Sequence, residues 1–156
     1  MSVLTVKTQL AAVELLNVSP KVNTAHVEIP RSIPAGELPA FINKAGNNIV
    51  TRLGGDILWY DTRTYFCQLL VANAQAGISG EAEALVESFI DECKDTFRSH
   101  PSLALEDIPL PDGIQRSWYV RDTGISTIKF SGMDYIGVQY ELQVVELADT
   151  ELSPLN

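Results

Sequence analysis

Histidine and cysteine, which supply many catalytic and metal-binding side chains, are scarce in this chain of 156 residues. The two histidines, His26 and His100, and the two cysteines, Cys67 and Cys93, stand far apart in the sequence. No C-x-x-C pair, H-E-x-x-H helix or G-x-S-x-G elbow is present, so the usual zinc and nucleophile motifs are missing. We therefore expect no enzymatic activity, no resident metal and no cofactor.

Basic residues are also few. The 11 lysines and arginines are outnumbered by 20 aspartates and glutamates, which gives a net charge of −9. Proteins that grip nucleic acid neutralise its phosphates with clustered basic residues, and this chain has only isolated pairs. Specific nucleic-acid binding is therefore disfavoured. An acidic surface usually serves solubility, and it would also suit a surface along which DNA slides without sticking.

Long apolar runs are absent, and the first residues do not have the pattern of a leader. No run approaches the roughly 20 apolar residues that a membrane-spanning helix needs. The first residues, MSVLTVKTQLAAVELL, lack the basic start and the long apolar stretch of a signal peptide. We therefore expect synthesis in the cytoplasm, no membrane contact, and two reduced cysteines in the core.

The remaining candidates for chemistry have simpler explanations. The stretch AGISGEA at 76–82 opens a predicted helix, but it matches no phosphate-binding loop, and its own glutamates oppose an anion. Asp91, Glu92 and Asp95 could in principle hold a metal ion. Such spacing on a helix more often marks a solvated face.

The clearest structural signals lie at residues 58–72 and 81–98. In the first segment Tyr65, Cys67, Leu69 and Val71 alternate with Phe66, Gln68 and Leu70, which predicts a central strand because both faces are mostly apolar. In the second segment apolar residues recur at steps of three and four, and Pro101 follows its end. This amphipathic helix has a predicted apolar stripe of Ala82, Leu85, Val86, Phe89, Ile90, Cys93 and Phe97.

Other segments carry weaker signals. Alternation and turn residues predict strands at 113–121, 125–130 and 135–147, with tight turns at 122–124 and 131–134. Residues 4–17 predict a short helix with a partial stripe of Leu4, Leu10, Val13 and Leu16. Residues 20–56 contain four prolines and predict an irregular arm, with a short strand at 26–30 and an extended loop at 33–48.

Together these elements predict an α+β fold. We expect a mainly antiparallel sheet of four to five strands, with the long amphipathic helix (81–98) and a short N-terminal helix packed on it. Residues 1–148 would form a single domain that includes the arm at 20–56. Residues 149–156 would form a flexible C-terminal tail.

Five phrases of the sequence resemble a known family. They are ELPAFINKAG (37–46), DTRTY (61–65), VANAQAGISGEAEALVESFID (71–91), the pattern F-x-x-x-P-x-L (97–103) and DTGISTIKFSGMDYIGVQYELQV (122–144). In this order they resemble the tail-terminator and tail-completion family of long-tailed, siphovirus-like bacteriophages and prophages. The resemblance covers most of residues 37–146 and rests on short phrases and their order, not on one diagnostic motif.

The resemblance implies a structural virion protein without catalytic residues. Such a protein forms a homo-hexameric ring at the head-proximal end of the tail tube, stops tube growth and joins the tail to the head-tail connector. The implied partners are other copies of the chain, the tail tube protein and the connector or stopper protein, and genomic DNA passes through the ring without specific binding. The implied location is the virion tail, after assembly in the host cytoplasm.

Related readings stay open at this point. Head-tail connector stoppers, tail tube proteins and minor capsid proteins share the size and the β-rich composition. A small-ligand-binding or enzymatic α+β domain is a more remote alternative.

A ring subunit needs contact surfaces, and the sequence offers candidates for them. In each of the pairs Trp59-Tyr60 and Trp118-Tyr119, we expect one ring in the core and the other at a partner surface. Edge-strand pairing and ordering of the arm at 20–56 would join the subunits. The candidate inter-subunit or ring-stacking contacts are Phe41, Arg52, Trp59, Arg63, Gln75, Ile78, Trp118, Met133 and Tyr135.

Overall fold

A computed structural model of the chain describes residues 3–52, 58–74, 80–101, 103 and 114–149. Within these residues two α-helices and a mixed six-stranded sheet confirm the predicted α+β fold, with more strands than the four to five expected. The elements in chain order are α1 (Val3–Glu14), β1 (Thr24–His26), a 3-10 turn η1 (Ala35–Glu37), β2 (Ala40–Arg52), β3 (Leu58–Asn73), α2 (Gly80–Ser99), β4 (Ile114–Asp122), β5 (Ser126–Phe130) and β6 (Met133–Asp149).

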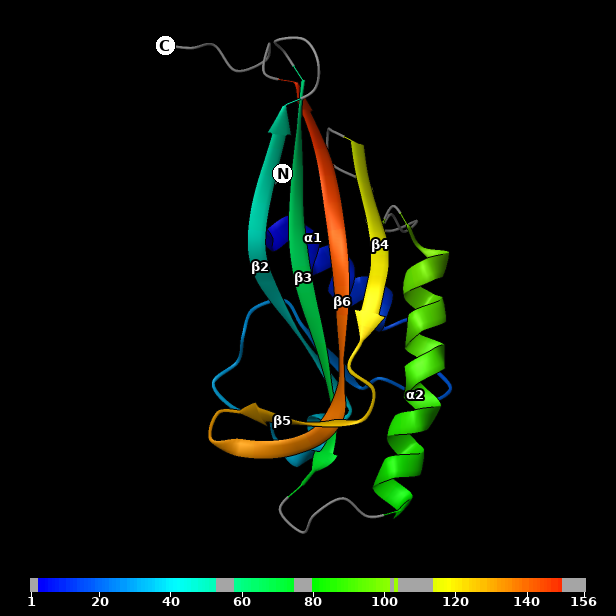
Figure 1. The fold of residues 1–156 in the computed structure, drawn as a ribbon. Helices are drawn as coiled ribbons and strands as arrows, with labels where there is room; N and C mark the ends of the chain where they lie inside the picture. Colours follow the sequence, from blue (N-terminus) through cyan, green and yellow to red (C-terminus); the bar gives the residue numbers. More distant parts are fainter. Residues whose placement is uncertain (1–2, 53–57, 75–79, 102, 104–113, 150–156) are drawn as a thin grey trace.

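The sheet is built on two long central strands. Its order is β1-β2-β3-β6-β4, and β5 pairs with the first part of β6. Only β1 and β2 run parallel; every other described pair is antiparallel. Figure 1 shows β2, β3, β6 and β4 side by side, with β5 crossing below them. The predicted central position of the strand at 58–72 is confirmed, because β3 has β2 on one side and β6 on the other.

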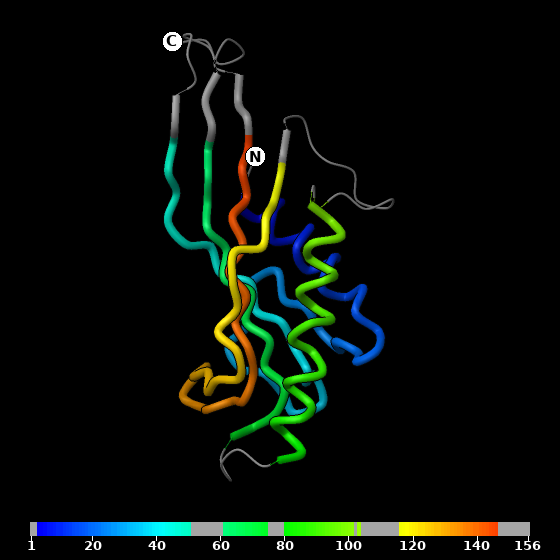
Figure 2. Tube along the Cα trace, turned by 45° about the vertical axis from the view of Figure 1, so that its right-hand side comes forward, coloured from blue at the N-terminus to red at the C-terminus, as the bar shows by residue number. Residues whose placement is uncertain are grey.

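Both helices cover the same face of the sheet. Figure 2 shows α1 and α2 on one side of the strands, with no helix on the other side. The main core lies between the two helices and the sheet, and it combines residues of α1, α2, β2, β3 and β6. Its largest fully buried side chains include Leu10, Phe41, Tyr65, Phe89 and Tyr140. A sheet of this kind needs an apolar layer on one face only, so the opposite face is free to differ.

A second, smaller core lies on the opposite face at the lower end of the sheet. It joins Leu70 of β3 and Ile42 of β2 to Ile128 and Phe130 of β5 and to Ile33. The β5–β6 hairpin folds over this end through a two-residue turn, Ser131-Gly132, and both turn residues have positive φ. The tight turn predicted at 131–134 is confirmed, and its Ser-Gly sequence fits a type I′ hairpin.

The largest departure from prediction is β2. Residues 33–48 were expected to form an extended loop, but Ala40–Arg52 is a 13-residue strand with both its ends paired to β3. A bulge between Ala45 and Asn48 interrupts the alternation, and Gly46 lies within it. Because a bulge and turn-forming residues hide the two-residue period, the strand does not stand out in the sequence. The predicted irregular arm is therefore confined to residues before Ala40.

Smaller corrections concern the ends and faces of elements. The first strand is Thr24–His26, not 26–30. Leu4 and Leu16, which were expected on the apolar stripe of the first helix, are exposed by 53% and 44%. Leu85 was expected on the apolar stripe of α2 and is 43% exposed. The alternation predicted for the last strand is confirmed, since Ile136, Val138, Tyr140, Leu142 and Val144 are all buried.

Candidate functional site

Among the described residues, no helix or loop covers one face of the upper part of the sheet. We call it the helix-free face and define it by side chains that alternate with the buried ones in the strand register. Mostly neutral polar residues, with Phe66, Glu141 and Val145 among them, lie on its two central strands, and hydrophobic and basic residues lie on the strands at both edges. Its described members are Lys44, Ile49, Thr62, Thr64, Phe66, Gln68, Arg116, Trp118, Arg121, Gln139, Glu141, Gln143 and Val145.

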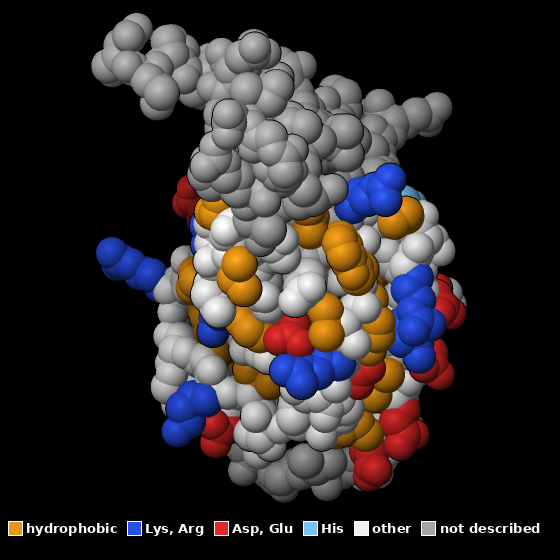
Figure 3. Space-filling view, turned by 45° about the horizontal axis from the view of Figure 1, so that its top comes forward, with side chains coloured by type: hydrophobic (Ala, Val, Ile, Leu, Met, Phe, Trp, Pro, Cys, Tyr) orange, Lys and Arg blue, Asp and Glu red, His pale blue; other side chains and the backbone are white. Residues whose placement is uncertain are grey.

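Two of these residues expose large hydrophobic surfaces. Ile49 on β2 is 62% exposed and Trp118 on β4 is 49% exposed. They stand near opposite edges of the face, because β3 and β6 run between β2 and β4. Figure 3 looks at the molecule from above this side and shows hydrophobic and basic side chains mixed over its middle. Single exposed hydrophobics are common, but a bare sheet face that carries a tryptophan is a candidate contact surface.

A shallow hollow lies at the lower border of the helix-free face. It has a volume of about 230 Å³ and is lined by Phe66, Arg121, Asp122, Thr123, Gln139 and Glu141. Arg121 Nε lies 2.7 Å from Glu141 Oε2, so the two charges at its rim neutralise each other. Next to it, Gln68 Nε2 donates a 2.8 Å hydrogen bond to Gln139 Oε1. The polar groups of the hollow are thus engaged with one another and leave no paired acid and base aimed at a substrate.

The outer edge of β2 is a second uncovered feature. The short strand β1 pairs with it only from Ala40 to Ile42, and no described strand pairs with it from Asn43 to Arg52. Val50 in this stretch is 53% exposed, next to Ile49. The bulge is fixed by Arg63, whose guanidinium donates a 2.9 Å hydrogen bond to the Gly46 carbonyl. A long edge with exposed hydrophobics is a template for pairing with another chain.

The opposite edge, β4, is partly blocked. The Ser117 amide and hydroxyl both donate to the Pro101 carbonyl, so the chain after α2 occupies this position of the edge. A bulge between Tyr119 and Arg121 bends β4 further along. The two edges of the sheet therefore differ, and β2 is the more open one.

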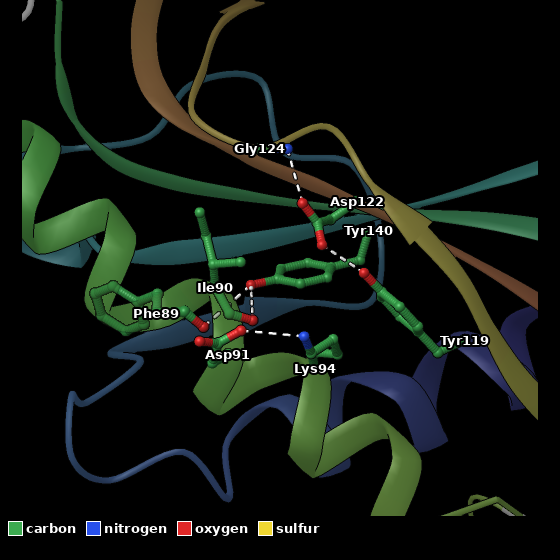
Figure 4. A network of polar contacts seen from close by, with 8 residues as sticks. All are labelled: Phe89, Ile90, Asp91, Lys94, Tyr119, Asp122, Gly124 and Tyr140. Atoms are coloured by element: carbon green, nitrogen blue, oxygen red, sulfur yellow. Dashed lines mark hydrogen bonds and ion pairs between the residues drawn. The ribbon is translucent and has the colours of Figure 1, made fainter.

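A polar network fixes α2 against the sheet (Figure 4). The Tyr140 hydroxyl, inside the core, lies 3.1 Å from the carbonyl oxygens of Phe89 and Ile90 on α2 and donates to them. The Tyr119 hydroxyl donates to Asp122, whose other oxygen accepts a 2.8 Å hydrogen bond from the Gly124 amide. Burial raises the pKa of both tyrosines well above the usual value. Both phenols therefore act as neutral hydrogen-bond donors: Tyr140 positions α2, and Tyr119 fixes Asp122 at the end of β4.

A buried pair of polar side chains, Glu14 and Asn43, was not foreseen from the sequence. Glu14 at the end of α1 is fully buried, and Asn43 of β2 donates a 2.8 Å hydrogen bond to its Oε1. Burial raises the pKa of Glu14 to about 8, while the contacts with Asn43 and Cys67 lower it. The sequence signal is a glutamate inside the apolar run Leu10–Leu16.

The cysteines and histidines do not assemble a centre. Cys67 and Cys93 are free and buried, and burial raises the pKa of both thiols, for Cys93 to about 12. His26 Nε2 lies 3.5 Å from Glu37, and His100 Nδ1 lies 2.8 Å from the Thr96 carbonyl. Across the described part of the chain, no three His, Cys, Asp or Glu residues are grouped so that they could hold a metal ion.

The candidate contact residues fall into three groups. Trp118 and Met133 are exposed by 49% and 37%, and Arg63 is half-buried against the β2 bulge. Phe41 and Tyr135 are buried within the monomer, by contrast, so the expectation of an inter-subunit contact is not met at these two positions. The side chains of Arg52 and Trp59 and the whole of Gln75 and Ile78 lie outside the described residues.

Of the two aromatic pairs, only Trp118-Tyr119 has its side chains among the described residues. Tyr119 packs against the main core, and Trp118 points to the exposed side of β4, as predicted for one core and one surface member. The side chains of Trp59 and Tyr60 are not among those described. The arrangement supports Trp118 as the surface member of its pair.

Comparison with known proteins adds no relative. The sequence matches no protein-family model and no curated protein. Within the described residues, neither helix is both long enough and apolar enough to cross a membrane.

Proposed function

We propose that this chain is a structural subunit of a bacteriophage tail, which forms a ring at the head-proximal end of the tail tube, ends tube growth and joins the tail to the head connector. The observation that carries the proposal is the uncovered half of the sheet. One face and one long edge are left without a covering element, and both expose large hydrophobics, including Ile49, Val50 and Trp118. Surfaces of this kind suit a subunit whose burial is completed by neighbours.

The phrases that resemble the tail-terminator family support the same proposal. They fall on β2, β3, α2 and the β5–β6 hairpin, which together make up most of the fold. The described part of the chain has no built catalytic group, and its hollow of about 230 Å³ has mutually neutralised charges at its rim. A binding and assembly role therefore fits the geometry better than a reaction does.

The test is electron microscopy of the purified protein, alone and mixed with polymerised tail tubes from the same phage or prophage. We expect closed single rings that cap one end of each tube and prevent further growth. Long tubes grown from this protein alone would make it a tube subunit. Particles that bind connectors but ignore tubes would make it a stopper, and particles that ignore both would contradict the proposal.

A deletion within residues 30–50 is not a suitable test. It would remove most of β2 together with Ile33 and Ile42, which belong to the second core. Loss of assembly would then report unfolding. Surface substitutions on described, exposed residues are the appropriate variants.

A further inference from the structure

The charge on the helix-free face is opposite to that of the whole protein. Its described charged side chains are Lys44, Arg116, Arg121 and Glu141, three basic and one acidic. The chain as a whole has a net charge of −9. Since Glu141 is already paired with Arg121, Lys44 and Arg116 give this face its positive character. Lys44 on β2 and Arg116 on β4 stand at opposite edges of this face. A face of an acidic protein whose unpaired charges are both positive indicates an acidic partner.

The outward side of α2 carries the matching charge. Glu83, Glu87, Asp91 and Asp95 follow one another at four-residue steps, and all four are exposed. They lie opposite the buried stripe of Val86, Phe89, Cys93 and Phe97. Like charges at this spacing repel one another and destabilise a free helix. Lys94 offsets part of this through its 3.1 Å contact with Asp91.

The two surfaces also carry exposed hydrophobic residues at or near them. Leu85 borders the buried stripe of α2, away from Glu83 and Glu87, and is 43% exposed, while the helix-free face exposes Trp118 and Ile49. Figure 3 shows acidic side chains towards the lower right, on the side where Figure 1 places α2, with basic ones beside them, and hydrophobic side chains over the middle next to one basic and one acidic group. Because α2 packs on the other face of the sheet, the two surfaces point in different directions and cannot meet within one molecule.

We propose that the helix-free face of one copy receives the acidic outward side of α2 from a second copy. A second copy fits this face because the two described surfaces of the chain carry opposite charges. The contact is head-to-tail, because it joins two different surfaces, and it leaves one unused surface on each subunit: the helix-free face on one and the acidic side of α2 on the other. Such an interface closes into a ring or continues as a filament. The inference rests on the proposed ring function and identifies the interface that would build it.

Charge reversal on each surface tests the inference in the full-length protein. The sheet variant is Lys44→Glu with Arg116→Glu, and the helix variant is Glu83→Lys with Glu87→Lys. Each places like charges across the contact, so we expect self-association about tenfold weaker or more. The combined four-fold variant restores opposite charges with the signs exchanged. Self-association is measured by sedimentation velocity and electron microscopy, with and without tail tubes.

The matched controls are Lys21→Glu and Glu28→Lys, single reversals at exposed positions outside both surfaces. Circular dichroism and thermal unfolding show that every variant is folded. We expect both controls to assemble like the unmodified protein, both reversal variants to fail, and the combined variant to recover.

Two results would overturn the inference: folded reversal variants that assemble normally, or a folded combined variant that stays dispersed. If reversal variants still form rings on tubes, the interface is wrong while the ring function stands. If the unmodified protein forms assemblies that obey the reversal pattern but never cap tubes, the interface stands and the ring function is wrong. A folded protein that never self-associates contradicts both.

Discussion

Asn43 on β2 donates a 2.8 Å hydrogen bond from its Nδ2 to Oε1 of Glu14 at the end of α1, and both side chains are fully buried. The second oxygen of Glu14 and the Asn43 carbonyl oxygen have no hydrogen-bond partner among the described residues. A carboxylate in such a place would be an uncompensated buried charge, whereas a neutral acid costs far less. The site therefore holds Glu14 in its protonated form.

This arrangement predicts that stability depends on pH through Glu14. Its pKa is raised from 4.5 to about 8 in the folded protein. A raised pKa means that the folded state keeps a proton that the unfolded state loses above about pH 4.5. The contribution is therefore fully present below about pH 4.5, falls as pH rises, and is lost above about pH 8, a range worth on the order of 5 kcal/mol.

The variant Glu14→Gln removes this dependence, because the amide keeps the shape of the neutral acid and cannot ionise. Urea unfolding at pH 5.5, 7 and 8.5 would show a smaller loss of stability with rising pH in the variant than in the unmodified protein. Glu28→Gln, at an exposed position, is the control and should leave the dependence unchanged. Parallel curves for the unmodified protein and the Glu14 variant would show that Glu14 is ionised in the folded state.

The hydroxyl and the ring of Tyr140 should contribute separately to the packing of α2 on the sheet. Tyr140→Phe removes a hydroxyl that bonds to two helix carbonyls while it keeps the ring in contact with Phe41 and Phe97. Because the carbonyls belong to a helix interior and keep their backbone partners, we expect a loss of only about 1 kcal/mol. Tyr140→Ala also removes the ring and should cost about 3–5 kcal/mol. Equal losses for the two variants, measured by chemical denaturation, would contradict this division.

The close approach of the β3 backbone to Gly137 on β6 should exclude any larger residue at this position. A Cβ at this position would lie 1.9 Å from the Leu69 carbonyl oxygen, and the obstacle is backbone, which cannot rotate away. We expect Gly137→Ala to destabilise the fold by about 3 kcal/mol or more. Gly36→Ala is the control, since no atom lies within 4 Å of the added carbon. A thermal midpoint that is unchanged by Gly137→Ala would show that β3 and β6 can separate at this point.

The elements that the sequence predicted well are those whose pattern is uninterrupted. The helix at 81–98 and the strands at 58–72 and 135–147 keep one period over most of their length, and they correspond to α2, β3 and β6. The register shift in β3, between Leu70 and Ala72, lies at its end, where it leaves the preceding alternation readable. The strand β2 was missed because its bulge breaks the period. Its pairing with β3 is a non-local property, because the partners extend from Arg52 and Trp59 out to Ala40 and Leu70.

The candidate surface was predictable only in part. The sequence indicated Trp118 as a surface aromatic because a neighbouring aromatic residue would take the core position, and the structure places the two rings in that way. It wrongly placed Phe41 and Tyr135 at a subunit contact. Phe41 was expected in a loop, but it lies on β2 and is buried in the main core. Tyr135 was expected near an exposed turn, but it is buried in the second core. The basic residues of the helix-free face share one surface because of the pairing register of four strands. No local sequence pattern contains that register.

The buried cysteines predict slow thiol chemistry in the folded protein. Cys67 and Cys93 are both fully buried, and burial raises the pKa of each thiol, which keeps them protonated at pH 8. A disulfide-exchange reagent at pH 8 should therefore react at the rate of unfolding. In denaturant both thiols should react at once, which serves as the control. Rapid reaction of either thiol without denaturant would mean that the core opens locally.

Trp118 predicts an assembly defect that is separate from folding. Its side chain is 49% exposed in the monomer, so Trp118→Ala should change the free energy of unfolding by less than about 1 kcal/mol. A tryptophan buried at an interface is a frequent source of binding energy, with losses of about 2 kcal/mol or more on truncation. Self-association should thus weaken by a factor of ten or more in sedimentation experiments. Leu15→Ala, at a residue that follows α1 and is 46% exposed, is the matched control and should assemble normally, because Leu15 belongs to neither proposed contact surface. If both variants assemble alike and remain folded, Trp118 lies outside the contact, and the helix-free face loses its main hydrophobic anchor.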